Sequence, residues 1–82
     1  MDGYEFSDHA KSMLIERQVP EAWAYLALGK PDETELHDDG TVHYIKTIEE
    51  FGNRHLRVIV NPSVQPHKIV TLFFDRRLRS SK

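Results

Sequence analysis

Apolar residues near the start of the chain recur at the spacing of a helix. The face defined by positions i, i+3, i+4 and i+7 carries Ala10, Met13, Leu14 and Arg17. Ser7 and Asp8 stand just before this pattern and are both good N-caps, and Asp8 also suits the positive end of the helix dipole. The pattern therefore predicts a first helix that begins at Ser7 or Asp8.

Arg17 shares the predicted core-facing stripe of this helix, although an arginine is seldom buried without a partner. Its guanidinium must therefore extend to water, pair with a carboxylate, or face a binding cleft. The sequence leaves these three alternatives open.

A second helix is predicted between two signals that start and stop helices. Pro20 suits a first helical turn, and Gly29-Lys30-Pro31 is a strong stop. Between them, Trp23, Leu26 and Ala27 form a packing stripe. The chain is thus expected to begin with two short helices.

Beyond Asp32 the apolar period changes to two, which is typical of strands. Residues 33–37 read as a short, charged edge strand, where charge discourages unwanted pairing. Asp38-Asp39-Gly40 reads as a turn, and residues 41–51 alternate as a longer strand.

Gly52-Asn53 is a plausible two-residue hairpin loop, with Gly where a type II′ turn requires it. In that register Lys46 opposes Ile59 and Ile48 opposes Arg57. The expected core face then holds Ile45, Leu56, Val58 and Val60. The opposite, mixed face holds Tyr44, Lys46, Ile48, His55, Arg57 and Ile59.

The last strand is expected over residues 68–74, after a loop over residues 61–67 that holds two prolines. Val70, Leu72 and Phe74 are predicted to point inward, while Thr71 and Phe73 join the mixed face. Residues 76–82 form a basic and, we expect, flexible tail to a single domain over residues 1–75.

These elements predict an α+β fold with two N-terminal helices packed on a three- to four-stranded antiparallel sheet. The expected core consists of Trp23, Leu26, Leu56, Val58, Val60, Val70 and Leu72.

Composition narrows the function classes. The 82 residues allow one modest core, and the absence of cysteine excludes disulfides, thiolate nucleophiles and thiolate metal sites. No apolar run has the length of a membrane span, and no signal peptide pattern opens the chain. We therefore expect a cytoplasmic protein without membrane association.

Charge is distributed unevenly along the chain. Residues 1–50 hold four Lys/Arg against twelve Asp/Glu, and residues 51–82 hold seven against one. The acidic and basic halves could neutralise each other within one compact fold, or the basic half could present a face to phosphates.

Candidate chemistry begins with His9, which could act as a general acid or base or could simply be a surface histidine. Arg17 could hold a phosphate bidentately or pair with a carboxylate. The two would stand about 12 Å apart along the helix axis and about 80° around it, so they could flank an extended substrate but not grip one atom.

No metal site or cofactor is expected. None of the five histidines lies four residues from another, and no zinc, phosphate-loop, Rossmann or Gly-x-Ser-x-Gly pattern is present. Metal-free cleavage of RNA requires few protein groups. The ribose 2′-hydroxyl supplies the nucleophile, and the protein supplies only a base, an acid and cations.

Several short motifs together resemble a known family. They are His9-Ala10, Arg17, Val19, Pro31-Asp32, Gly40 before Tyr44, Gly52 before Leu56-Arg57-Val58-Ile59, and Ile69-Val70-Thr71. Across residues 4–74 this set is similar to small prokaryotic domains of unknown function placed with the RelE/ParE-like toxin fold, in the barnase–EndoU–colicin–RelE group.

The resemblance implies a helix-helix-sheet fold and a ribonuclease or toxin role. Its matched polar positions are His9, Arg17 and Thr71, which it makes the candidate catalytic residues, with His9 as acid or base and Thr71 orienting the substrate. RNA or the ribosome, and an antitoxin protein, are the implied partners. The family commonly has an arginine at the position of Met13, and this departure weakens the case for catalysis.

The sequence supports two hypotheses. The first is a metal-independent endoribonuclease or toxin relative in which Lys46, Arg57, His55 and Tyr44 bind the substrate. The second is a non-catalytic protein-interaction domain on the same scaffold, which the acidic half of the chain and Met13 favour.

Overall fold

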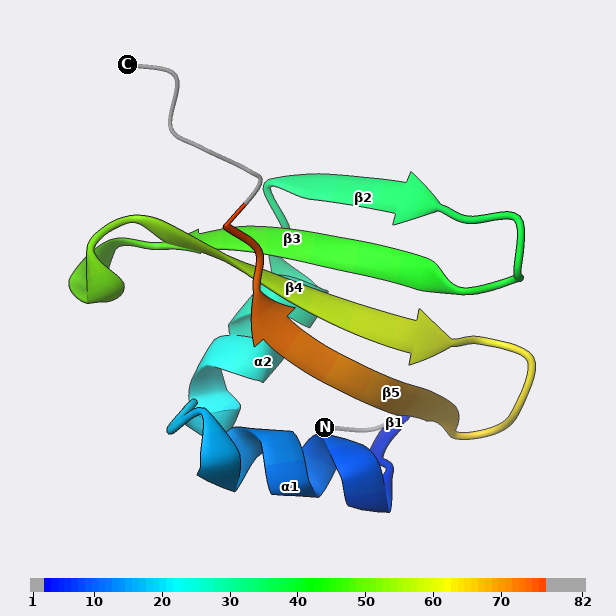
Figure 1. Cartoon of the computed structure of the whole chain (residues 1–82). Coiled ribbons are helices and arrows are strands. Elements are labelled where there is room, and N and C mark those ends of the chain that lie inside the picture. Colours follow the sequence, from blue (N-terminus) through cyan, green and yellow to red (C-terminus); the bar gives the residue numbers. More distant parts are fainter. Residues whose placement is uncertain (1–2, 77–82) are drawn as a thin grey trace.

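A short strand and two helices precede a meander of four strands. The computed structural model describes residues 3–76 (Figure 1). Its elements are β1 (Tyr4–Phe6), α1 (Asp8–Glu16), α2 (Glu21–Gly29), β2 (Glu33–Leu36), β3 (Val42–Ile48), a 3₁₀ turn η1 (Glu49–Phe51), β4 (Arg54–Asn61) and β5 (His67–Phe74). Residues 77–82, most of the predicted tail, lie outside the described residues.

The sheet has five strands in the order β1-β5-β4-β3-β2. Strands β2 to β5 pair antiparallel, whereas β1 runs parallel to β5, with Tyr4 opposite His67 and Phe6 opposite Ile69. The α+β class is confirmed, but the prediction of a three- to four-stranded antiparallel sheet was wrong. The missed strand β1 is only three residues long, too short for alternation to be visible in the sequence.

α1 begins where the sequence predicted, and α2 begins one residue after Pro20 and ends at the predicted stop. Ser7 is the N-cap of α1, and its hydroxyl accepts the Ala10 N–H at 3.0 Å. The same hydroxyl donates to the Val70 carbonyl at 2.9 Å, so the cap also ties α1 to β5. Pro20 precedes α2, which ends at Gly29.

The register of β3 against β4 differs from the predicted one. Lys46 lies opposite Leu56 rather than Ile59, a difference of three residues, because η1 lengthens the connection before Gly52-Asn53. An odd shift exchanges the two faces of a strand. Ile48 therefore enters the core at 1% exposure, while Ile45, at 3%, is buried outside the main cluster.

A bulge displaces one residue of β5. Ile59 pairs with Thr71 and Val60 pairs with Ile69, so Val70 has no partner in the ladder and is exposed. The prediction that Val70 belongs to the core was wrong, and Ile69 takes that place. Thr71 lies on the side of the sheet away from the helices, as predicted.

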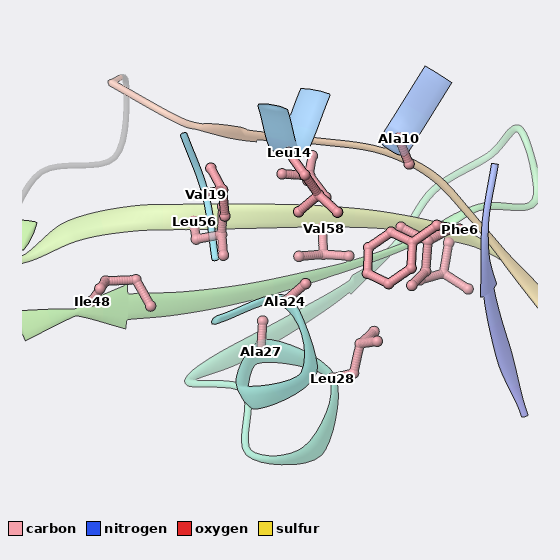
Figure 2. Close-up of a cluster of buried hydrophobic side chains, with 13 residues drawn as sticks. Phe6, Ala10, Leu14, Val19, Ala24, Ala27, Leu28, Ile48, Leu56 and Val58 are labelled. Atoms are coloured by element: carbon pink, nitrogen blue, oxygen red, sulfur yellow. The ribbon is translucent and has the colours of Figure 1, made fainter. Parts of the chain in front are cut away.

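The core lies between the two helices and one face of the sheet (Figure 2). α1 packs on β5 and β1, and α2 packs on β3 and β4. Of the predicted core, Leu56, Val58, Val60 and Leu72 are fully buried and Trp23 packs partly buried against them, but Leu26 is exposed. No helix in residues 3–76 is long and apolar enough to cross a membrane.

Candidate functional site

The face of the sheet away from the helices, here called the open face, carries a buried arginine. Arg57 alternates with the core residues Leu56 and Val58 along β4, so its side chain must lie on the open face. It is only 6% exposed. A buried guanidinium needs its donors satisfied, and neighbouring elements supply the acceptors.

Four side chains from three segments surround Arg57. Its Nε donates to Asp75 Oδ2 at 2.8 Å, and its Nη1 lies 2.9 Å from Glu35 Oε1 and 2.8 Å from His43 Nδ1. His37 Nε2 lies 3.0 Å from Glu35 Oε1, and its ring stacks on that of His43 at 3.6 Å between centroids. We call Arg57, Asp75, Glu35, His43 and His37 the Arg57 cluster.

Hydrogen bonding and burial in the Arg57 cluster lower two pKa values. Hydrogen bonds from Arg57 and then His37 lower the pKa of Glu35. Burial, followed by the nearby charges of His37 and Arg57, lowers the pKa of His43, which is therefore neutral at pH 7. Since a guanidinium can only donate, neutral His43 accepts at Nδ1 and carries its proton on Nε2.

The fold brings together a potential metal-ligand set that the sequence spacing does not reveal. One ligand atom each from Glu35, His37 and His43 lies within 4.8 Å of the others. However, Arg57 already donates to both Glu35 and His43, and the remaining His43 nitrogen carries a proton. A metal ion would have to displace the guanidinium, so the arrangement favours an ion-pair network, and the expectation of no metal site stays a prediction.

The four predicted substrate-binding residues do not share a face. Tyr44 and Lys46 lie opposite Val58 and Leu56 on the helix side of the sheet, and Lys46 pairs with Asp32 at 3.5 Å. His55 and Arg57 lie on the open face. This division follows directly from the register error, since the predicted pairing placed all four together.

A cleft opens where α1, the β3–β4 connection and the end of β5 meet. It has a volume of about 900 Å³ and is lined by residues 16–17, 51–55 and 74–76. Asp75 lines the cleft and also bonds Arg57. The cleft and the Arg57 cluster therefore share one buried carboxylate, which is 4% exposed.

Three arginines that form no ion pair within residues 3–76 line the cleft. Arg17, Arg54 and Arg76 are exposed, and none takes part in an ion pair within residues 3–76. Arg57 differs, because two carboxylates already engage it. Glu16 also lines the cleft. Guanidinium groups that line one open space without a carboxylate partner are suited to bind a phosphate or a carboxylate.

His55 is the imidazole at the cleft. Its Nδ1 lies 3.1 Å from Thr47 Oγ1, and its Nε2 is buried without a hydrogen-bond partner in the part of the chain that the structure describes. If Nδ1–H donates to the Thr47 hydroxyl, Nε2 has a lone pair available to take a proton.

The structure separates the three predicted catalytic residues. His9 is exposed on α1, and Thr71 lies on the open face beyond the core. Arg17 follows the last turn of α1, is exposed and lines the cleft, which agrees with two of the three alternatives left open for it, extension to water and a place at a cleft. Neither His9 nor Thr71 belongs to the cleft lining.

The structure contains both arrangements that the uneven charge allowed, neutralisation between the two halves and an unpaired basic region within residues 3–76. Glu35–Arg57 and Glu5–Lys68 pair the acidic half of the chain with the basic half, while Arg54 and Arg76 remain available. The mutual neutralisation is thus partial, and it leaves cations concentrated at one end of the sheet.

Comparison with protein families matches residues 6–74 to a family described as Domain of unknown function (DUF4258). The chain belongs to this family. Neither the curated proteins nor the solved structures contain a match. The DUF4258 description assigns no activity, so a function is inferred from the geometry of the cleft.

Sequence reasoning missed most of the residues that define these two sites in this DUF4258 domain. Glu35, His37 and His43 fall in and beside the edge hairpin, and only the correct register shows that they face Arg57. Phe51 directly precedes the predicted turn and Arg54 directly follows it, and this aromatic and basic pair across the turn was the signal available in the sequence.

Proposed function

We propose that this domain binds the phosphodiester backbone of RNA in the cleft and cleaves it without a metal ion. The observation that carries the proposal is that Arg17, Arg54 and Arg76, none of them in an ion pair within residues 3–76, line one cleft together with His55. The resemblance to RelE/ParE-like toxins points to the same class of reaction.

The chemistry needs few groups. The ribose 2′-hydroxyl attacks the neighbouring phosphorus, a base accepts its proton, and the bond to the 5′-oxygen breaks as that oxygen takes a proton from water. The products are a 2′,3′-cyclic phosphate and a 5′-hydroxyl. The imidazole of His55, which lines the cleft, is the proposed proton acceptor, and the three guanidinium groups stabilise the negative charge that builds on the phosphorane.

Binding is tested by fluorescence anisotropy with a short labelled single-stranded RNA at increasing salt. Each phosphate contact to a single strand contributes about −0.7 to the slope of log affinity against log salt. We expect Arg17→Gln, Arg54→Gln and Arg76→Gln each to reduce the slope by about that amount. Lys11→Gln, which removes an exposed charge outside the cleft lining, is the matched control.

Cleavage is tested in the presence of a chelator, with ribosomes supplied in a parallel reaction. Wild type should release fragments ending in a cyclic phosphate, and His55→Gln should slow this on the order of a hundredfold while RNA binding persists. An intact RNA in both reactions would refute the nuclease, and an unchanged slope in all three arginine variants would refute the binding site.

A second candidate function is a protein-interaction domain. Its specific support is β2, an edge strand with one unpaired side, on which Leu36 is 83% exposed. A partner strand could add along β2 by backbone hydrogen bonding. Absence of RNA binding at low salt, together with loss of a protein complex in Leu36→Lys, would favour this function.

A further inference from the structure

The cleft has an aromatic wall as well as cations. Phe51 and Phe74 both line it, with ring centroids 4.9 Å apart. Phe51 is 39% exposed, which is unusual for a phenylalanine that borders the core aromatics Trp23 and Phe74. The exposed part of this ring adjoins the space in which the proposed function places the RNA backbone.

Arg54 lies against this wall. Its guanidinium carbon is 4.8 Å from the centre of the Phe51 ring, within the range of a cation–π contact. The pair therefore presents an aromatic face and a planar cation side by side, and nucleobases stack on both kinds of surface. Phosphates next to the same base would meet the guanidinium groups of Arg17 and Arg76.

We propose that the cleft holds one unpaired nucleobase against Phe51 and Arg54, which makes single-stranded RNA the substrate class. This inference rests on the proposed function, because it assigns the base while that function assigns the backbone. The volume of about 900 Å³ lies within the range of pockets that bind small ligands, so it accommodates a nucleotide. In a duplex, each base is stacked between its neighbours and offers no free face to Phe51.

The chain contains a reporter for this contact. Trp23 is its one tryptophan, and its ring lies 5.7 Å from that of Phe51. A base stacked on Phe51 would change the surroundings of this ring pair directly, whereas a strand without bases reaches the pair only through the Arg54 guanidinium that lies against Phe51. Intrinsic fluorescence therefore distinguishes base contact from backbone contact.

The experiment compares three probes of equal length, all with 2′-O-methyl riboses so that the nucleophile is blocked. The probes are a single-stranded oligonucleotide, the same backbone without bases, and a duplex. We expect the single strand to bind about tenfold more tightly than the abasic strand and to change Trp23 fluorescence. Phe51→Leu should remove this preference, while Phe73→Leu, an aromatic outside the cleft lining, should preserve it.

The outcomes separate the two proposals. Equal affinity for single-stranded and abasic probes, with salt-dependent binding intact, would overturn base stacking and leave the proposed backbone site standing. Absence of binding to every probe would overturn both. Retention of the preference in Phe51→Leu, with the variant shown to be folded by circular dichroism, would also overturn the assignment of Phe51.

Discussion

Replacing Arg57 by methionine tests whether the Arg57 cluster is a structural ion-pair network. The change keeps an unbranched side chain of similar length and removes the guanidinium that donates to Asp75, Glu35 and His43. Asp75 is 4% exposed, so its carboxylate stays buried in the variant without its 2.8 Å partner.

The size of the effect follows from that burial. Removing one member of a buried ion pair costs about 3–5 kcal/mol. We expect the lower end, about 3 kcal/mol, because Asp75 takes part in a further interaction besides its bond with Arg57 Nε. A domain of this size has a total stability of about 4–12 kcal/mol, so the loss is a large share of it.

Urea denaturation followed by circular dichroism measures the effect. With a slope of about 1–1.5 kcal/mol per molar urea, the midpoint of Arg57→Met should fall by about 2–3 M. Arg54→Met is the matched control on the same strand, since Arg54 is exposed and forms no ion pair within residues 3–76, and it should change stability by less than about 0.5 kcal/mol.

A double-mutant cycle with Asp75→Asn then isolates the pair. Arg57→Met should cost clearly less in the Asp75→Asn background than in wild type, because the buried charge is already gone. Equal costs in the two backgrounds, or an Arg57→Met protein as stable as Arg54→Met, would refute the structural role of the cluster.

Further predictions concern pH, capping and catalysis. The pKa of His43 lies below its ordinary 6.5, so on acidification the unfolded chain binds a proton before the folded chain does. The stability of the domain, measured by urea midpoints at each pH, should therefore be highest above about pH 6.5 and fall below it. The fall should be less steep in His43→Gln. A second decline at lower pH should follow from the lowered pKa values of Asp32, Glu35 and Asp39, and a flat profile from pH 7 to the acid limit would contradict both. Ser7→Ala should cost about 1 kcal/mol in the same denaturation assay, and Ser7→Asp should recover part of it by restoring the acceptor for the Ala10 N–H; no recovery would place the effect in the lost bond to Val70. In RNA cleavage, His55→Gln should reduce the rate on the order of a hundredfold and His9→Ala much less, and the reverse order would favour the assignment by family resemblance.

The elements that the sequence predicted well are those decided by nearby residues. The N-cap at Ser7, the stop at Gly29 and the charged edge strand β2 depend on groups a few positions apart in the chain. A cap hydrogen bond or a helix stop acts within one turn, so the local pattern contains the information. The membership of Leu56, Val58 and Val60 in one face follows for the same reason, because alternation is a property of a single strand.

Features that depend on pairing between distant segments became visible only in the folded chain. Three residues of η1 changed the β3–β4 register, and that odd shift moved Ile48 into the core and set His43 beside Arg57. The short strand β1 is held by its parallel partner β5, which follows it by some sixty residues in the chain, and Asp75 meets Arg57 only because β5 lies next to β4. Hydrogen-bonded pairing has nearly the same backbone energy in several registers, so the packing of side chains from the whole domain selects among them. For that reason the local sequence was enough to define most helices and strands of this protein. The packing of the whole domain decided that Arg57 became part of a buried ion-pair network while Arg54 stayed exposed at the cleft.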